Sequence, residues 1–255
     1  MKLHFKTYGQ GEPLIILHGL LGSLDNWATL AKKFAENYTV FVIDQRNHGK
    51  SPHAKEFNYE ILAEDLLEFM DDNHLYSANI LGHSMGGKTA MNFAVNNPDR
   101  VQKLIIADIA PIKYDGGHQL IFDALFSINL NEIKSRKEVD TQLEAFIKEF
   151  GIRQFLMKGL TRDKDKNFVW KFNLKDIWDS YSEIINTFDD SDAEFDGETL
   201  FVKGANSNYI LDEYLPKIDE IFPNNTHETI EGAGHWLHAE KPEVFFKLVS
   251  KFLHD

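Results

Sequence analysis

A serine placed between glycines is the group in this chain best suited to covalent chemistry. Residues 82–87 read Gly-His-Ser-Met-Gly-Gly, after an apolar run at 79–81 and before a helical stretch that starts at residue 88. At a sharp strand-to-helix turn such a serine is held in a strained conformation, and the glycines remove Cβ atoms that would collide. The helix N-terminus favours developing negative charge. The pattern predicts that Ser84 is a nucleophile, and the alternative is an ordinary turn.

A serine hydroxyl at neutral pH needs a base, and the base needs an orienting acid. His235 is the candidate base, because it lies in the glycine-rich segment 231–236 just after the last predicted strand. Flanking glycines let this loop carry the imidazole over the sheet, where it can accept a proton and return it. The alternatives are a surface histidine without a role in catalysis, and His238 as the base. We assign His238 to the start of the last helix.

The orienting acid has two candidates. The acid commonly lies in the loop after the penultimate strand. Here that loop, residues 204–209, reads Gly-Ala-Asn-Ser-Asn-Tyr and contains no carboxylate. An amide cannot supply the charge that stabilises an imidazolium. Asp108 ends an apolar strand, where a carboxylate without a partner is costly to bury. We therefore expect Asp108 to be the acid, with a strand-end group bonded to backbone amides as the alternative. Asp212, which looks like a helix-start residue, is the second candidate.

Backbone N–H groups are expected to bind the oxyanion that forms when serine attacks. One belongs to Met85, directly after the nucleophile, and the other to Leu20, in the loop after the first buried strand. His18, in that same loop, is expected to make a structural hydrogen bond within it. Asp44 and Arg46 follow the next strand and are expected to lock neighbouring loops by ion pairing. A direct contact between Arg46 and the substrate is the alternative.

The elements that must position these groups alternate along the chain. The predicted strands are 3–8, 13–17, 39–44, 78–81, 103–108, 198–202 and 227–231. The predicted helices between them are 26–36, 59–73, 85–97, 209–222 and 241–254. Several strands are apolar throughout, which is typical of strands buried on both faces of a parallel sheet. The alternation predicts an α/β fold with a mostly parallel, doubly wound sheet and right-handed crossovers.

Residues 112–190 break this alternation, since they show helical patterns and little strand. We expect them to form a helical cap inserted into a core made of residues 1–111 and 191–255. Such insertions leave at the carboxyl ends of the strands, where α/β proteins bind ligands. A second helical layer packed on the sheet is the alternative. The aromatic residues expected to form the substrate pocket are Phe122, Phe126, Phe155, Trp178 and Trp236.

Composition excludes several classes of protein. The chain has 255 residues, a net charge of −13 and no cysteine. The absence of cysteine excludes disulfides, thiolate chemistry and cysteine-bound zinc, and the sequence shows no closely spaced metal ligands, so no metal or cofactor is expected. The negative charge argues against nucleic acid and anionic membranes as partners. The N-terminus has no apolar signal segment, and no run approaches the ~18 apolar residues of a membrane span. We expect a cytoplasmic protein, and a monomer and a homodimer both fit.

Together these motifs resemble the α/β-hydrolase superfamily and, more narrowly, the bacterial YbfF-type esterases. The shared segments are His18-Gly19-Leu20-x-Gly22-Ser23-x-Asp25-Asn26, Arg46-Asn47-His48-Gly49-x-Ser51, Gly82-His83-Ser84-Met85-Gly86-Gly87-Lys88, Asp108-Ile109-Ala110-Pro111 and Gly232-Ala233-Gly234-His235-Trp236. The resemblance implies an α/β-hydrolase fold with a nucleophile elbow at Ser84. It also places the acid of the catalytic triad after the strand that follows the elbow helix, in agreement with Asp108.

The expected function is that of a serine carboxylesterase that hydrolyses short- to medium-chain acyl esters through an acyl-enzyme. Some members of the group resemble acyl-CoA thioesterases, so an acyl thioester, or another acyl group cleaved by the same triad, is the alternative substrate. The expected partner is a small-molecule acyl ester or thioester. A binding module that has lost activity is a further alternative. Such proteins usually lose a member of the triad, and none is missing here.

Overall fold

The seven predicted strands form one sheet. The computed structural model describes residues 1–187 and 193–255. The strands of this sheet are β1 (His4–Tyr8), β2 (Glu12–Leu17), β3 (Tyr38–Asp44), β4 (Ala78–His83), β5 (Val101–Ala107), β8 (Thr199–Gly204) and β9 (Asn225–Ile230). Their order is β1-β3-β2-β4-β5-β8-β9. Only β1 runs antiparallel to its neighbour, so the prediction of a mostly parallel sheet is confirmed.

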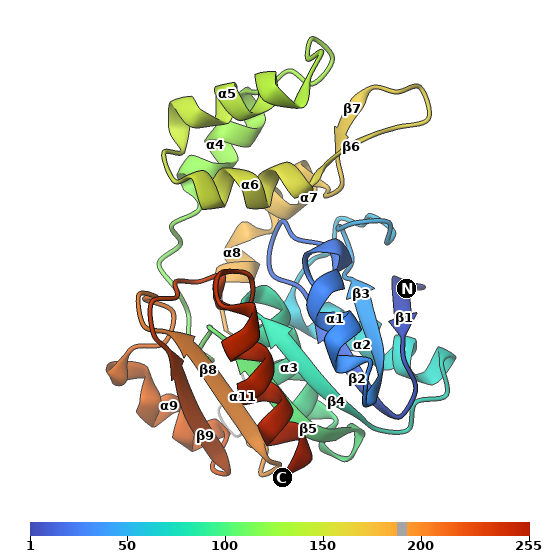
Figure 1. Ribbon diagram of the computed structural model, residues 1–255, viewed down its shortest axis with the longest axis vertical. Coiled ribbons are helices and arrows are strands. Elements are labelled where there is room, and N and C mark those ends of the chain that lie inside the picture. The colour runs from blue at the N-terminus through green and yellow to red at the C-terminus, as the bar shows by residue number, and fades with distance from the viewer. Residues whose placement is uncertain (188–192) are drawn as a thin grey trace.

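Helices cover both faces of the sheet. They are α1 (Ala28–Phe34), α2 (Tyr59–Asp72), α3 (Met85–Asn96), α9 (Leu215–Ile221), α10 (Leu237–Glu240) and α11 (Pro242–His254). In β2, Ile15 and Leu17 pack with side chains of α2, α3 and α9, whereas Leu14 and Ile16 pack with side chains of α1 and α11. Successive strand residues thus point to opposite faces, and both faces are apolar. In Figure 1, α11 crosses in front of the sheet and α3 lies behind it.

A separate group of elements lies between β5 and β8, over one end of the sheet (Figure 1). These elements are α4 (Gln119–Ser127), α5 (Arg136–Phe146), α6 (Phe150–Lys158), β6 (Leu160–Arg162), β7 (Phe168–Trp170), α7 (Leu174–Asp179) and α8 (Tyr181–Ile185). Their apolar side chains share one cluster with Leu21 and Met85, which follow β2 and β4. The group therefore packs over the carboxyl ends of these strands. The expected boundary at residues 190 and 191 lies outside the described residues.

Three details differ from the expected elements. The short hairpin β6–β7 lies in the segment where little strand was expected, because strands of three residues are too short to show a period. The first helix is preceded by a separate 3₁₀ turn, Leu24–Asn26. The helix expected from residue 209 begins only at Leu215, with Pro216 in its first turn, where a missing N–H costs little. As a result Tyr209 stays in a loop beside the cavity described below.

Within residues 1–187 and 193–255, no helix combines the length and the apolar character that crossing a bilayer would need.

Candidate active site

Ser84 occupies a strained turn between β4 and α3. Its φ is +54°, in the left-handed region that non-glycine residues rarely adopt, and it is the N-cap of α3. The neighbouring glycines are required by close backbone contacts. A Cβ atom on Gly82 would lie 2.2 Å from the carbonyl oxygen of Gly86, and one on Gly86 would lie 2.5 Å from that of Leu17. The expected sharp turn is therefore present, and it raises the serine above the end of the sheet.

Three of the predicted side chains meet in one hydrogen-bonded chain. The His235 Nε2 atom lies 3.0 Å from the Ser84 hydroxyl oxygen, and its Nδ1 atom lies 2.8 Å from the Oδ2 atom of Asp108. A carboxylate can only accept, so Nδ1 carries the proton and donates it. The lone pair of Nε2 is then free to accept from the serine hydroxyl. This arrangement can draw a proton from Ser84.

The Asp108 carboxylate is fully buried and has several donors around it. It accepts hydrogen bonds from the backbone N–H of Gly204, at 3.0 Å, and from the hydroxyl of Ser207, in addition to His235. These donors compensate for the loss of water around the charge. Ser207 lies in the loop 204–209, which contains no carboxylate, and the sequence does not predict its contact with Asp108. Asp212, the other candidate acid, begins a 3₁₀ turn, and among the described residues it makes no hydrogen bond to His235.

The backbone N–H groups of Leu20 and Met85 belong to the surroundings of the serine. In the part of the chain that the structure describes, the N–H groups of Leu20 and Met85 donate no hydrogen bond, and both residues line the cavity at Ser84. The loop of Leu20 passes very close to the elbow, since a Cβ atom on Gly19 would lie 3.2 Å from the Cβ atom of Ser84. Both N–H groups are therefore available to a ligand of Ser84.

Loops that carry these groups are held by buried polar contacts. His18 joins its own loop to the next one, because its Nδ1 atom donates to Gly19 and its Nε2 atom accepts from the N–H of Gln45. Arg46 forms a buried ion pair with Asp65 on α2, at 2.6 and 2.8 Å.

The prediction that Asp44 forms an ion pair is wrong. Its carboxylate instead accepts from the backbone N–H groups of Leu24 and Lys50, and among the described residues no cation lies within ion-pairing distance of it. The reason is local, because the chain wraps around the end of β3 and turns these amides towards the carboxylate. Asp44 therefore still fixes neighbouring loops, but through amides.

Comparison with known proteins places this architecture in a family. The sequence profile of the alpha/beta hydrolase fold matches residues 12–242. The chain belongs to that family. It is 34% identical to Esterase YbfF of Escherichia coli over 96% of this chain and 94% of the relative. It is 36% identical to the sn-1-specific diacylglycerol lipase ABHD11 of Mus musculus, over 94% of this chain and 80% of the relative.

One solved structure is very similar. A marine microorganism esterase superposes with a TM-score of 0.96 at 47% identity, over 98% of this chain and 99% of the other. The predicted α/β-hydrolase fold and the resemblance to the YbfF-type esterases are thus confirmed.

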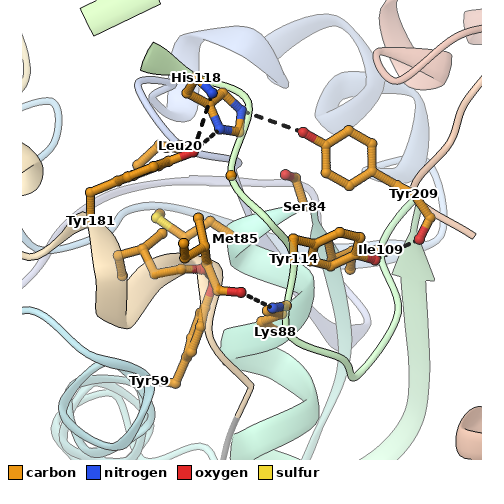
Figure 2. Close-up of a pocket in the computed structure, with 13 residues that line it drawn as sticks. Leu20, Tyr59, Ser84, Met85, Lys88, Ile109, Tyr114, His118, Tyr181 and Tyr209 are labelled. Carbon is orange, nitrogen blue, oxygen red and sulfur yellow. Dashed lines mark hydrogen bonds between the residues drawn. The ribbon is translucent and has the colours of Figure 1, made fainter.

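In this hydrolase fold the space around Ser84 has three parts. An inner cavity of about 30 Å³ lies between Ser84 and Lys88 (Figure 2). A connecting cavity, also about 30 Å³, lies between Ser84 and Trp236. An outer cleft of about 450 Å³ lies between α6 and the segment 234–240. Ser84 thus lines the two small cavities, whereas His235 and Trp236 line the connecting cavity and the outer cleft.

The aromatic residues expected to bind substrate divide into two groups. Phe155 and Trp236 line the connecting cavity and the outer cleft. Among the described residues, Phe122, Phe126 and Trp178 line none of these three spaces, and their role in binding substrate stays a prediction.

The position of these three aromatic residues follows from packing. Phe122 is completely buried, with its ring 4.8 Å from that of Trp178, and the partly exposed Phe126 packs on the same indole ring at 6.4 Å. Phe122 and Trp178 thus join α4 to α7 within the apolar cluster of the segment over the sheet, whereas Phe126 is exposed beside it. Aromatic content alone does not distinguish such a core from a pocket wall.

The side chains of His118, Tyr181 and Tyr209 form a hydrogen-bonded group beside Ser84, here called the roof, which the sequence does not predict. The Nδ1 atom of His118 lies 2.6 Å from the Tyr181 hydroxyl, and its Nε2 atom lies 3.4 Å from the Tyr209 hydroxyl (Figure 2). The Tyr209 ring stacks on His235 at 3.9 Å between ring centres. Burial, and to a smaller extent His235, lowers the pKa of His118 to about 4, so this imidazole is neutral near pH 7. The roof thus connects the segment between β5 and β8 to the imidazole that contacts Ser84.

Several other histidines are buried in the neutral form. Burial lowers the pKa of His18, His48 and His83, and it lowers the pKa of His238 to about 3. His18 and His48 each accept a backbone N–H at one ring nitrogen and donate to a carbonyl oxygen with the other. A second proton on either ring would lose the accepted bond. The folded protein therefore resists protonation at these positions.

Acid should destabilise the fold for this reason. In the unfolded chain a histidine binds its proton near its ordinary pKa of 6.5, whereas folded His118 and His238 bind theirs only at about 4 and about 3. The unfolded state then binds more protons, so we expect the free energy of unfolding to fall as pH decreases below about 6.5. Each such histidine contributes up to about 1.4 kcal/mol per pH unit. Urea unfolding at a series of pH values measures the slope.

Two variants identify the source of that slope. His238→Phe should make the decrease shallower, because a planar apolar ring can replace the imidazole that stacks on Trp27 at 4.2 Å. His74→Asn is the matched control, since His74 is exposed and has a φ of +57°, which asparagine tolerates. Stability that stays constant down to about pH 4 would contradict the assignment of neutral buried histidines.

Proposed function

We propose that this chain is a carboxylic ester hydrolase that cleaves small-molecule esters through an acyl-enzyme on Ser84. The observation that carries the proposal is the continuous chain from the Ser84 hydroxyl to His235 and to the buried Asp108, with contacts of 3.0 and 2.8 Å. The names of the relatives, which include an esterase and a lipase, support the same activity. Ser84 also lines two small cavities, each of about 30 Å³.

Acylation follows from the positions of these groups. The Ser84 oxygen attacks the acyl carbon while His235 Nε2 accepts the hydroxyl proton, and Asp108 stabilises the imidazolium that forms. The carbonyl oxygen becomes an oxyanion, which accepts hydrogen bonds from the N–H groups of Leu20 and Met85. The bond to the leaving oxygen then breaks. His235 gives its proton to that oxygen, and an alcohol is released with the acyl group on Ser84.

Deacylation repeats the same steps with water. His235 removes a proton from a water molecule, which attacks the acyl carbon, and the oxyanion again meets Leu20 and Met85. Collapse of this intermediate breaks the bond to Ser84. His235 returns the proton to the serine oxygen, and the carboxylic acid leaves. The residues of the chain thus carry every proton transfer in the cycle.

We also propose that residues 112–190 serve as a cap on a catalytic core of residues 1–111 and 191–255. The packing of this segment over the carboxyl ends of β2 and β4 supports that role. Phe155 and Trp236, whose rings lie 5.4 Å apart, would hold the apolar part of the substrate between the cap and the core. Covering the site in this way excludes bulk water from the acyl-enzyme.

A fluorophosphonate probe tests the nucleophile directly. An activated serine attacks the phosphorus and displaces fluoride, so we expect one adduct per chain, located by peptide mass spectrometry on Ser84. Ser207 is the internal control, because it also contacts Asp108 but is hydrogen-bonded to no histidine among the described residues. Hydrolysis of p-nitrophenyl acetate should stop in proportion to labelling. Turnover that continues in the fully labelled protein would reject the acyl-enzyme mechanism.

A further inference from the structure

A buried lysine beside Ser84 has no part in the proposed reaction. Lys88 lies one turn into α3, where its backbone N–H donates to the carbonyl oxygen of Ser84 at 3.0 Å. The residue is only 1% exposed, and it lines the inner cavity together with Ser84. Burying an ammonium group is costly unless its donors are bonded. The contacts of this side chain therefore show what the buried charge does.

The ammonium of Lys88 uses all of its hydrogen-bond donors. It has three N–H groups. They donate to three backbone carbonyl oxygens, which belong to Ile112, at 2.7 Å, Ile185, at 3.3 Å, and Asn186. The ring centres of Tyr59 and Tyr114 lie 5.6 and 4.8 Å from the Nζ atom, within the ~6 Å range of cation–π contacts. A lysine thus binds backbone that comes from two distant parts of the chain.

The three carbonyl groups belong to the two connections between the core and the segment that we propose as the cap. The first connection, residues 112–118, leads from β5 to α4, and the second, residues 181–186, contains α8. The N–H of Tyr114 donates to the carbonyl oxygen of Ile185 at 2.9 Å and so joins the two connections directly. Lys88 therefore ties both of them to α3, the helix that begins after Ser84.

The same two connections carry the roof. His118 ends the first connection and Tyr181 begins the second, and their side chains are bonded at 2.6 Å. The two connections are thus held together at two places, at Lys88 and at the roof. The third residue of the roof, Tyr209, stacks on His235. In Figure 2, Ser84 lies between Lys88 and the roof, and all of these groups except His235 line one cavity.

We propose that Lys88 is a positioning residue, whose ammonium holds the two connections so that the roof keeps the imidazole of His235 against Ser84. This inference rests on the proposed function, because it concerns the base of that reaction. Lys88 acts through the roof and carries no proton in the cycle. Its effect depends on charge, since a neutral amine has only two N–H donors and leaves one of the three carbonyl oxygens without its bond.

This dependence on charge falls within an accessible pH range. Burial lowers the pKa of Lys88 to about 7. Burial also lowers the pKa of His118 to about 4, so that this imidazole stays neutral above pH 6. Burial raises the pKa of each tyrosine hydroxyl among the described residues of the cavity wall, which are Tyr59, Tyr114, Tyr181 and Tyr209. Among the described residues of that wall, Lys88 is thus the group that changes charge between pH 6 and pH 9.

Hydrogen exchange tests the contacts of Lys88 without any substrate. Protection factors, which correct for the intrinsic effect of pH on exchange, are measured for residues 112–118 and 181–186, with β2 as the reference. In the wild type we expect the two connections to lose about tenfold in protection between pH 6 and pH 9, while β2 keeps its own. In Lys88→Met, which keeps an unbranched side chain without the ammonium, protection of the connections should be low at both pH values.

Fluorophosphonate labelling at pH 6 tests the effect on Ser84. We expect the labelling rate of Lys88→Met to be about tenfold or more below that of the wild type, because His235 is less well placed to accept the serine proton. Lys103→Met is the matched control. Lys103 also donates to a carbonyl oxygen and lies over a ring, both of Phe252, but it joins β5 to α11. This variant should label within about twofold of the wild-type rate.

Chemical rescue separates the ammonium from the shape of the side chain. The chain contains no cysteine, so the thiol of Lys88→Cys is a unique target for 2-bromoethylamine. In urea the thiolate displaces bromide, and the product is a side chain of lysine length that ends in an ammonium. After refolding, we expect this protein to label within about threefold of wild type carried through the same steps. Untreated Lys88→Cys should label as slowly as Lys88→Met.

The outcomes separate this inference from the proposed function. Lys88→Met that labels as fast as the wild type, or treated Lys88→Cys that folds but stays slow, overturns the positioning role. Equal protection of the connections at pH 6 and pH 9 in the wild type also overturns it, and this result needs no variant to fold. Wild-type Ser84 that does not react with the probe rejects the proposed function, and the exchange data then still decide whether Lys88 holds the connections. Slow labelling and fast exchange that the restored ammonium reverses support the positioning role.

Discussion

Replacing Ser84 with alanine is expected to lower kcat for p-nitrophenyl acetate by a factor of about 10⁴–10⁶. The methyl group of alanine cannot form an acyl-enzyme, and a water molecule would have to attack the ester directly. The free N–H groups of Leu20 and Met85 would still stabilise an oxyanion, so a small residual rate should remain. Initial rates with an excess of variant protein, after correction for spontaneous hydrolysis, measure this loss.

The variant should keep the wild-type fold. The Ser84 hydroxyl bonds to His235 at the edge of a cavity, so its removal leaves a ring nitrogen that water can reach. The strained φ of +54° belongs to the turn and remains in the alanine variant. Ser207→Ala is the matched serine control: it removes one of several donors to Asp108, and we expect a much smaller loss, about tenfold. Comparable activity in Ser84→Ala and wild-type protein would exclude Ser84 as the nucleophile.

The sequence predicts the sheet well because its strands are buried on both faces. The run Leu14-Ile15-Ile16-Leu17 is apolar at every position, and alternate residues do pack into two different clusters. The hairpin of Leu160–Arg162 and Phe168–Trp170 has no such pattern, since each strand has only three residues. Its pairing depends on contacts within the segment that covers the sheet, which local periodicity does not encode.

In the candidate site, too, the residues whose roles depend on sequence neighbours can be predicted, and those whose roles depend on distant segments cannot. Ser84 stands out because backbone contacts exclude a side chain at Gly82 and Gly86, and that requirement is visible in the sequence. Lys88 and His118 do not stand out, because their roles depend on carbonyl and hydroxyl groups that come from segments far along the chain. Phe122 shows that an aromatic residue near a site can be part of the core, because its side chain is completely buried.

The sequence favours Asp108 because a carboxylate is absent elsewhere. The loop 204–209 has no carboxylate, and the structure puts the hydroxyl of Ser207 and the N–H of Gly204 against the carboxylate of Asp108 instead. The carboxylate that contacts His235 thus comes from the end of β5, while the loop after β8 supplies hydrogen-bond donors to it. Because β5 and β8 are adjacent parallel strands, a carboxylate after either strand lies at the same edge of the sheet. The roles assigned to Asp108 and Asp212 remain a prediction that substitution can decide.

Asp108→Asn is expected to lower kcat/KM by about 10⁴, whereas Asp212→Asn should change it by less than about twofold. Asparagine fits the same space, but an amide lacks the charge that stabilises the imidazolium, and its NH₂ group can reverse the tautomer of His235. In that tautomer Nε2 carries the proton and cannot accept one from Ser84. Asp212 begins a short 3₁₀ turn, and its substitution should affect only that turn.

The two variants form a matched pair, since each exchanges one carboxylate for an amide of equal size. Steady-state rates with p-nitrophenyl acetate give the ranking, and the rate of fluorophosphonate labelling reports on Ser84 activation without the deacylation step. Because Asp108 acts through His235, both measurements should fall together in Asp108→Asn. A thermal midpoint near that of the wild type would show that the buried amide is accommodated. A larger loss of kcat/KM in Asp212→Asn than in Asp108→Asn would transfer the role of the acid to Asp212. Equal and small losses of kcat/KM in both variants would mean that His235 works without a carboxylate partner.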